Sequence, residues 1–237
     1  MKVLGIIPAR YESSRFPGKP LAKILGKSMI QRVYEQSKKC VELNELIIAT
    51  DDKRIYKHAL TFNANVMMTS KSHTTGTNRC GEVLQNLKTP YDIVVNIQGD
   101  EPLINPFKIK KVISLFNNSK TDIATLAKKI TSNKIIEDKN TPKVMIDDCN
   151  KALQFCRKIE DPISLKKYYQ HIGIYAYKSA ILEKIINLPQ TINEKKESLE
   201  QLRWLDHRYK IYVGLTNLNS ISVDTPDDII KVENEII

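Results

Sequence analysis

The sequence predicts an α/β protein with a mixed, mostly parallel central sheet. Short apolar runs alternate with helix-like segments through residues 1–97, as expected of βαβ units. Residues 93–95, Ile-Val-Val, are continuously β-branched, which is typical of a strand buried on both faces. Beyond residue 120 the chain holds several strand-like pieces with fewer strong helices between them, which favours a mixed arrangement there.

The elements of the first half can be placed in order. Strands are expected at 3–7, 46–49, 66–68 and 92–97. Ser28 is expected to cap the first helix, and the polar residues 50–52 to start the second. The polar stretch 73–79 is expected to be a loop, followed by a helix over 80–88.

The second half continues with shorter pieces. Strands are expected at 122–128, 143–147, 152–156, 171–177 and 211–214. Two helices are expected around 194–206 and 227–236. Because no long linker or repeat interrupts the 237 residues, we expect one compact domain.

Composition restricts the class of protein. A hydrophobic fraction of 41% and a charged fraction of 27% are ordinary for a globular protein. No apolar run approaches the roughly 20 residues that cross a bilayer, and the first run is too short for a signal peptide. The four cysteines lack metal-binding spacing. We therefore expect a cytoplasmic protein with no membrane partner.

The net charge of +10 raises the possibility of an anionic partner. The lysines are scattered over polar helix faces, and no basic stripe is interleaved with aromatic residues. We therefore expect no nucleic-acid partner. A nucleic-acid-binding protein remains the rival from another class, and it would bind RNA or DNA with a steep salt dependence.

The loop after the first strand carries three cations among turn-forming residues. They are Arg10, Arg15 and Lys19. In a parallel sheet, ligands bind outside the carboxyl ends of the strands. Three fixed cations there suit a polyphosphate, and backbone N–H groups around Ser13, Ser14 and Gly18 would add donors. The alternative is that these cations are solvated loop residues.

Two carboxylates are candidate Mg²⁺ ligands. Asp100 follows the strand that ends near 97, where a metal bound to phosphate would lie. The alternative is that Asp100 or Glu101 caps the next helix. Asp224 precedes Thr225, which is expected to cap the last helix and so leave the Asp224 carboxylate available. Spacing alone does not show that the two carboxylates meet.

Six motifs together carry a family likeness, in the order in which the family has them. They are IIPARYESSRFPGKP at 6–20, HTTGTNR at 73–79, VNIQGDEPLI at 95–104, HIGIYAY at 171–177, ESLEQLR at 197–203 and SVDTP at 222–226. The chain resembles the CMP-Kdo synthetases, the 3-deoxy-manno-octulosonate cytidylyltransferases of lipopolysaccharide assembly. The resemblance spans nearly the whole length.

This resemblance implies a Rossmann-like three-layer nucleotidyltransferase fold in a single domain, usually a homodimer. The nucleotide-binding part would cover about 1–105, and the sugar-binding and dimerisation part about 106–237. The implied reaction transfers CMP from CTP to the anomeric hydroxyl of Kdo, with Mg²⁺, and releases pyrophosphate. CTP and the sugar acid would be its partners.

The resemblance also implies a role for each site residue. The catalytic residues would be Arg10, Lys19, Asp100 and Asp224, of which Asp100 and Asp224 would bind the metal. The nucleotide-binding residues would be Pro8, Ala9, Arg10, Ser14, Lys19, Thr75, Gly76, Arg79 and Gln98. The sugar-binding residues would be Arg15, Gln98, Arg157, His171, Tyr175, Glu200 and Gln201.

The predicted sugar residues also admit a structural interpretation. His171, Gly173 and Tyr175 alternate with apolar residues, a pattern that also fits plain core. Glu200 and Gln201 also fit an ordinary helix surface. The segment 158–170 does not resemble the usual family loop, so 8-amino-Kdo or a related sugar acid is an alternative substrate. A different nucleotide-sugar pyrophosphorylase is a further alternative.

Overall fold

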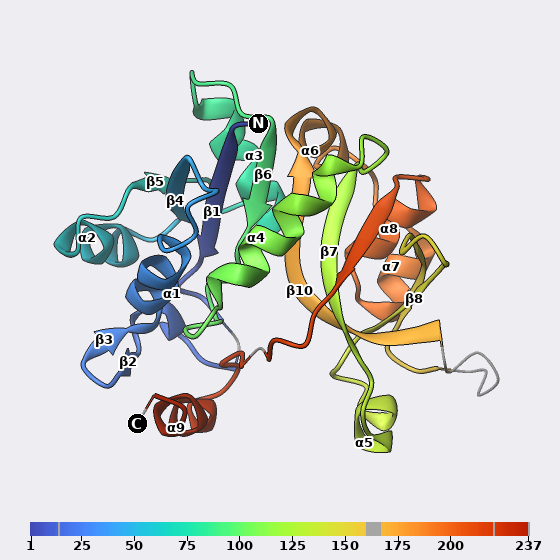
Figure 1. Cartoon of the computed structure of the whole chain (residues 1–237). Coiled ribbons are helices and arrows are strands. Elements are labelled where there is room, and N and C mark those ends of the chain that lie inside the picture. The colour runs from blue at the N-terminus through green and yellow to red at the C-terminus, as the bar shows by residue number, and fades with distance from the viewer. Residues whose placement is uncertain (14, 160–166, 220, 237) are drawn as a thin grey trace. The chain divides into compact units, whose positions relative to one another are not determined.

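The computed structural model describes residues 1–13, 15–159, 167–219 and 221–236. The chain forms two compact units, shown in Figure 1. The first unit is made of Met1–Lys110 and Asn219–Ile237, and the second of Lys111–Leu218. The end of the chain therefore returns to the unit in which the chain begins.

The first unit is built on a parallel sheet with the strand order β6-β1-β4-β5. Its strands are β1 (Val3–Ala9), β4 (Glu45–Thr50), β5 (Val66–Met68) and β6 (Ile93–Asn96). The chain runs from β1 outward to β4 and β5 and then crosses to β6 on the other side of β1. This reversal creates a switch point beside β1, where α/β sheets bind ligands.

Helices accompany these strands, and several of them have a readable start signal. They are α1 (Met29–Ser37), α2 (Lys53–Thr61), α3 (Gly76–Asn86) and α9 (Asp227–Asn234), with α4 (Pro106–Ser114) leading into the second unit. Ser28 accepts a hydrogen bond from the Gln31 N–H and Asp52 accepts one from the Arg54 N–H, so both predicted helix starts are confirmed. A small hairpin, β2 (Lys23–Ile24) and β3 (Lys27–Ser28), precedes α1.

The second unit carries the mixed part of the fold. Strand β10 is antiparallel to β7 and to β8, β8 is antiparallel to β9, and β11 is parallel to β7. The strands are β7 (Ile123–Lys129), β8 (Lys143–Ile146), β9 (Ala152–Cys156), β10 (Tyr168–Lys178) and β11 (Ile211–Leu215). The helices are α5 (Asn133–Glu137), α6 (Ser179–Ile185), α7 (Ile192–Glu197) and α8 (Gln201–Asp206). The predicted α/β fold with a mixed, mostly parallel sheet is confirmed.

Three predicted boundaries were wrong. Strand β1 continues through Pro8 to Ala9, and Pro8 is in register with Ala49 of β4. Helix α3 begins at Gly76, inside the stretch expected to be a loop. The helix expected around 194–206 is two helices, because Ser198 adopts a left-handed conformation with φ of 52° and ends α7.

None of the helices in the described residues is long and apolar enough to cross a bilayer.

Candidate active site

A pocket of about 270 Å³ lies in the first unit. It is lined by every predicted residue of this unit that the structure describes. These are Pro8, Ala9, Arg10, Arg15, Lys19, Thr75, Gly76, Arg79, Gln98, Asp100 and Asp224. Ser14, which the resemblance implied as a nucleotide contact, lies outside the described residues. Segments far apart in the sequence therefore meet at one pocket.

The ends of two adjacent strands form the pocket floor. Pro8 and Ala9 end β1, and Gln98 to Asp100 follow β6, which pairs directly with β1. The two segments approach so closely that a Cβ atom on Gly99 would lie 2.8 Å from the Pro8 carbonyl oxygen. Only glycine fits at this position, because the obstacle is backbone rather than a movable side chain.

Lys19 joins the two predicted carboxylates. Its Nζ donates to Asp100 Oδ2 at 2.9 Å and to the Val223 carbonyl at 2.7 Å, and it lies 3.8 Å from Asp224 Oδ1. The Lys19 side chain is only 15% exposed. An ammonium group has three N–H donors, so one remains for a substrate oxygen after these two hydrogen bonds. The fold thus brings Asp100 and Asp224 to a common cation, which spacing could not show.

A small apolar cluster places Asp224. Ile24, Met29, Val223 and Val232 are fully buried together, so the segment before α9 is fixed beside the loop that carries Lys19. Burial of each such side chain stabilises the protein by roughly 1.5–3 kcal/mol. The position of Asp224 therefore depends on hydrophobic packing of its neighbour.

The start of α9 differs from the prediction. Thr225 does not cap the helix. Its hydroxyl and its N–H both donate to Asp228 Oδ2, which also accepts the Asp224 N–H. A hydrogen bond from Lys231, together with these donors, outweighs burial and lowers the pKa of Asp228. The Asp224 carboxylate is nevertheless available, as predicted, and it accepts a hydrogen bond from Arg15 at 2.9 Å.

The N-terminus of α3 lies at the pocket. Thr75 is the N-cap, and its hydroxyl accepts the Asn78 N–H at 3.1 Å. Thr74, Thr75 and Gly76 all line the pocket. The first N–H groups of a helix and its dipole favour an anion at this end. Thr75 and Gly76 therefore lie where a helix N-terminus favours an anion, and their contact with a nucleotide stays a prediction.

Arg79 is a buried residue that lines the pocket. Its guanidinium is 3–4% exposed and donates to Asp51 Oδ2 at 2.7 Å, to the Thr69 hydroxyl and to the Ser70 carbonyl. These bonds tie α3 to the end of β4 and to the loop after β5. Sequence reasoning missed the role of Asp51, although its position directly after a predicted strand was a signal.

Glu82 fixes the same loop at two further points. Its carboxylate accepts the Ser70 N–H at 2.8 Å and contacts Nε2 of His73, which lines the pocket. Burial alone would raise the pKa of Glu82, but the hydrogen bonds from Ser70 and His73 bring it below the usual value. Arg79 and Glu82, three residues apart on α3, thus hold the loop entering the helix.

The pocket residues fit a divalent cation of the Mg²⁺ type. Mg²⁺ prefers one or two carboxylates completed by phosphate oxygens and water rather than a cage made only of protein. Asp100 and Asp224 supply two carboxylates, both within 4 Å of Lys19 Nζ, in a pocket that is also lined by Thr75 and Gly76 at the start of α3. In the described part of the chain no group of three or more acidic, His or Cys side chains forms a fuller cage.

In the second unit, Arg157 braces the backbone. Its Nε donates to the Glu197 carbonyl at 2.7 Å, and its two Nη atoms donate to the carbonyls of Lys139 and Ser198 at 3.1 Å. Sequence reasoning did not foresee this bracing. Carbonyls of the described residues thus engage three of its five N–H donors, and contact of Arg157 with a sugar stays a prediction.

His171 lies in a buried polar bulge of β10. The register between β10 and β7 shifts between Ile172 and Tyr175. At the bulge, the Thr125 hydroxyl donates to the Ile174 carbonyl at 2.8 Å, and His171 Nε2 lies 2.9 Å from the same hydroxyl oxygen. Burial lowers the pKa of His171 to about 3, so the ring is neutral and Nε2 is the donor to Thr125.

An aromatic cluster follows His171 along the same strand. The rings of His171 and Tyr175 are 5.4 Å apart, and Trp204 of α8 meets Tyr175 and Tyr177 edge-on. The predicted grouping of His171 and Tyr175 on one face is confirmed. Burial, and secondly the charge of Glu200, raise the pKa of Tyr175 well above its usual value.

Gln201 is buried at the start of α8, next to a buried ion pair. Arg203 binds Glu194 through two parallel hydrogen bonds, at 2.7 Å from Nε and 2.6 Å from Nη2. The pair ties α7 to α8 on either side of Ser198. Glu200 and Gln201 are therefore held at a fixed helix junction rather than on an ordinary helix surface.

Comparison with known proteins shows the family of this chain. The cytidylyltransferase family profile matches residues 4–211. The 3-deoxy-manno-octulosonate cytidylyltransferase of Parabacteroides distasonis is 48% identical over 98% of this chain and 96% of its own length. The same enzyme of Fusobacterium nucleatum is 44% identical over 100% and 97%.

Solved structures show the same relationship. A CMP:2-keto-3-deoxy-manno-octonic acid synthetase complexed with CTP superposes with a TM-score of 0.93 at 36% identity, covering 100% of this chain and 98% of its own. A 4-diphosphocytidyl-2C-methyl-D-erythritol synthase from Anaerococcus prevotii, at 16% identity and a TM-score of 0.67, shares the fold over 99% and 98% of the two chains. The chain belongs to the cytidylyltransferase family, among the 3-deoxy-manno-octulosonate cytidylyltransferases.

Proposed function

We propose that this protein transfers CMP from CTP to the anomeric hydroxyl of Kdo, giving CMP-Kdo and pyrophosphate. The observation that carries the proposal is the pocket in which Lys19 joins Asp100 and Asp224 beside the N-terminus of α3. Relatives with 3-deoxy-manno-octulosonate cytidylyltransferase activity, matching over nearly the full chain, support the choice of nucleotide and sugar.

The triphosphate would lie between the cations and the helix. The N–H groups at the start of α3, around Thr75 and Gly76, would receive phosphate oxygens. Arg10, exposed at the pocket, and Lys19 would neutralise the charge that develops as pyrophosphate leaves. The sugar hydroxyl would lose its proton to solvent and attack the α-phosphorus. The new P–O bond would form as the bond to pyrophosphate breaks in line, and pyrophosphate would leave.

Asp100 and Asp224 would hold Mg²⁺. The ion, when bound, supplies charge neutralisation for the triphosphate and lowers the pKa of a coordinated hydroxyl. The carboxylates would keep their orientation through Lys19 and Arg15, which already contact them. Positioning and electrostatic stabilisation, rather than covalent chemistry by the protein, would therefore account for the rate.

Arg15 and Gln98, which line the pocket of the first unit, would recognise the sugar acid. Sugar binding by His171, Tyr175, Glu200 and Gln201, which belong to the second unit, stays a prediction. An arginine suits the sugar carboxylate, because the two groups match in geometry. Glu200 would accept hydrogen bonds from sugar hydroxyls. The role of Arg157, the single-domain organisation with parts at about 1–105 and 106–237, and the homodimer remain predictions.

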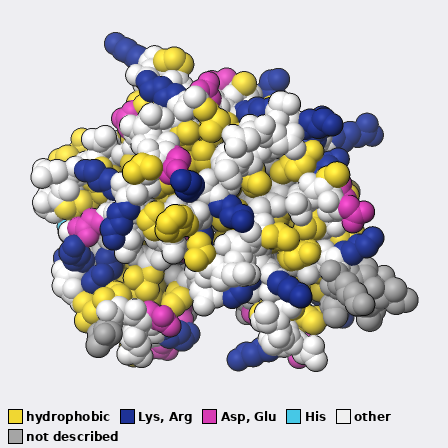
Figure 2. All heavy atoms as spheres, in the orientation of Figure 1, with side chains coloured by type: hydrophobic (Ala, Val, Ile, Leu, Met, Phe, Trp, Pro, Cys, Tyr) yellow, Lys and Arg dark blue, Asp and Glu magenta, His cyan; other side chains and the backbone are white. Residues whose placement is uncertain are grey.

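A cytoplasmic location belongs to the same proposal. No disulfide joins the cysteines of the described residues, Cys40, Cys80, Cys149 and Cys156, which fits a reducing compartment. A role in nucleic-acid binding is not favoured. On the face drawn in Figure 2, Lys and Arg side chains are spread among other side chains rather than gathered in a stripe.

The test is pyrophosphate release with CTP and Mg²⁺ in the presence of Kdo, 8-amino-Kdo or N-acetylneuraminic acid, repeated with UTP and GTP. We expect release that requires both CTP and Kdo. Preference for 8-amino-Kdo would keep the mechanism and change the sugar. Folded protein that binds CTP but releases no pyrophosphate with any of the three sugars would contradict the proposal.

A further inference from the structure

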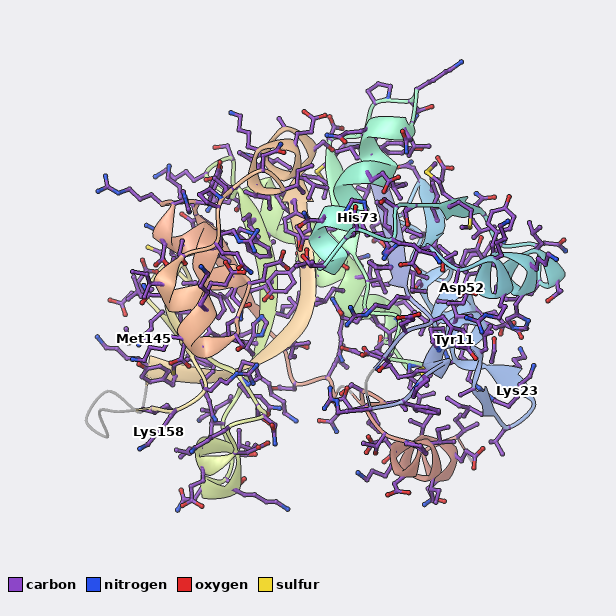
Figure 3. All side chains as sticks on the ribbon, turned by 180° about the vertical axis from the view of Figure 1, so that it is seen from behind. Tyr11, Lys23, Asp52, His73, Met145 and Lys158 are labelled. Atoms are coloured by element: carbon purple, nitrogen blue, oxygen red, sulfur yellow. The ribbon has the colours of Figure 1, made fainter. Side chains whose placement is uncertain are left out.

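The cation-bearing loop of the pocket is held from outside by an aromatic contact. The Arg54 guanidinium lies over the Tyr11 ring, with Cζ 3.2 Å from the ring centroid. Arg54 belongs to α2, whereas Tyr11 lies between Arg10 and the rest of the loop. Figure 3 labels Tyr11 and Asp52, which lie close to one another beside this helix.

Arg54 is itself held in a fixed orientation. Its Nε and Nη2 donate to the two oxygens of Asp52, at 2.9 and 2.7 Å, in a bidentate pair. Asp52 caps α2 directly after β4, so the guanidinium plane is fixed to the sheet. The hydrogen bonds from Arg54, which outweigh burial, lower the pKa of Asp52 to about 2. The pair therefore stays charged at neutral pH.

The other side of the contact closes the loop. The Gly18 N–H donates to the Tyr11 carbonyl at 2.8 Å. Gly18 has a left-handed φ of 74°, and a Cβ atom built there would lie 3.0 Å from Cζ of the Tyr11 ring. A glycine is therefore required by both the backbone conformation and the ring. Since Arg10 precedes Tyr11 and Lys19 follows Gly18, this closure sets the spacing of the two cations.

We propose that Tyr11 and Arg54 are positioning residues that hold the loop carrying Arg10 and Lys19 in the geometry that binds the triphosphate. Neither residue lines the pocket, so each acts through the loop rather than by touching the nucleotide. The inference rests on the proposed function only for the identity of the ligand as CTP. The anchoring itself is a property of the protein alone.

The test compares Arg54→Ala with Lys57→Ala, which removes an equal charge from an exposed position on the same helix. Arg54→Ala should weaken CTP binding about two- to fivefold, as expected from loss of an exposed cation–π contact. Lys57→Ala should bind CTP like the wild type. CMP lacks the terminal phosphates, so its affinity should change less than that of CTP.

Tyr11→Phe keeps the ring and should retain CTP affinity, whereas Tyr11→Ala should lose on the order of tenfold or more, because small misplacements of binding groups are costly. Thermal stability of the variants, measured alongside, should stay near that of the wild type, since the Arg54 side chain is 58% exposed. Equal CTP affinity in Arg54→Ala and the wild type, or equal losses for CTP and CMP, would overturn the proposal.

Hydrogen exchange of the Gly18 amide separates this inference from the proposed function. Exchange should be faster in Tyr11→Ala and Arg54→Ala than in the wild type and Lys57→Ala. Unchanged exchange in both variants would overturn the anchoring. A wild-type protein that shows no CMP transfer would contradict the proposed function, while the Gly18 amide would still decide whether the loop is anchored.

Discussion

The pocket of the first unit and the buried polar groups of the second unit differ in their exposure to solvent. In the first unit, charged side chains surround an open pocket, and Asp100, Asp224 and Arg15 are 30%, 44% and 65% exposed. In the second unit, His171, Tyr175 and Arg203 are at least nine-tenths buried. Charges at the pocket are thus available to a ligand, whereas the buried groups depend on one another for their position.

This difference has an energetic consequence. A buried charge that loses its partner keeps the full cost of desolvation, whereas an exposed charge returns to water. Substitution of a buried charge such as Arg203 should therefore act mainly on stability, and substitution of the pocket charges mainly on activity.

Arg203→Ala should have the largest effect on stability. It leaves Glu194 buried without its bidentate partner, which typically costs about 3–5 kcal/mol. The free energy of unfolding from urea denaturation measures the loss. Lys195→Ala, an exposed cation on α7, is the control and should change stability by less than about 0.5 kcal/mol. A similar loss of unfolding free energy in the two variants would contradict this role of the buried pair.

Lys19→Ala should mainly reduce activity. Removal of one preorganised charge-stabilising donor typically raises the barrier by about 2.7–4 kcal/mol, or roughly 10²–10³ in kcat. Steady-state pyrophosphate release measures the loss. Lys23→Ala changes an exposed cation a few residues away, labelled in Figure 3, and should leave kcat unchanged. A Lys19→Ala enzyme with more than half of the wild-type kcat would contradict the role of Lys19.

Gly99→Ala tests the close approach of the two strand ends. The new Cβ would meet the Pro8 carbonyl at 2.8 Å, so the backbone must shift, at a cost of about 1–3 kcal/mol. Gly76→Ala is a suitable control, because its Cβ would lie at an ordinary 3.4 Å from Pro8 Cγ. Urea unfolding of both variants should show the loss in Gly99→Ala alone, and an equal loss in both would refute the close contact.

The pH dependence of stability tests the burial of His171. Its pKa is about 3 in the folded protein and about 6.5 when unfolded, so below pH 6.5 the unfolded state binds an extra proton. Stability should fall with decreasing pH by up to about 1.4 kcal/mol per unit from this group. His171→Gln should lack that contribution between pH 6.5 and 4.5, and parallel slopes in the two proteins would contradict the assignment.

Local signals predicted most of the first unit. The caps Ser28 and Asp52, the β-branched strand at 93–95 and the cations after β1 all have short-range causes, and the structure contains them as expected. The meeting of Asp100 with Asp224 has a long-range cause. It depends on packing of Val223 with Ile24 and Met29, which no local pattern specifies.

The misses have a common physical origin. Asp228 replaced Thr225 as the organising group at α9, and Arg157 was engaged by three backbone carbonyls. Each of these side chains can form hydrogen bonds with several kinds of partner. The choice depends on which carbonyls and N–H groups the fold leaves nearby, so residue type alone could not decide it. The bulge at His171 likewise depends on Thr125 of a neighbouring strand.

In the proposed function, Asp100 and Asp224, joined by Lys19, form a site for a metal-bound triphosphate. Calorimetric titration of CTP with and without Mg²⁺, using the wild type and the Asp100→Asn/Asp224→Asn variant, tests it most directly. We expect Mg²⁺ to strengthen CTP binding to the wild type, and the variant to lose about tenfold or more of that gain. An equal response to Mg²⁺ in both proteins would contradict the account.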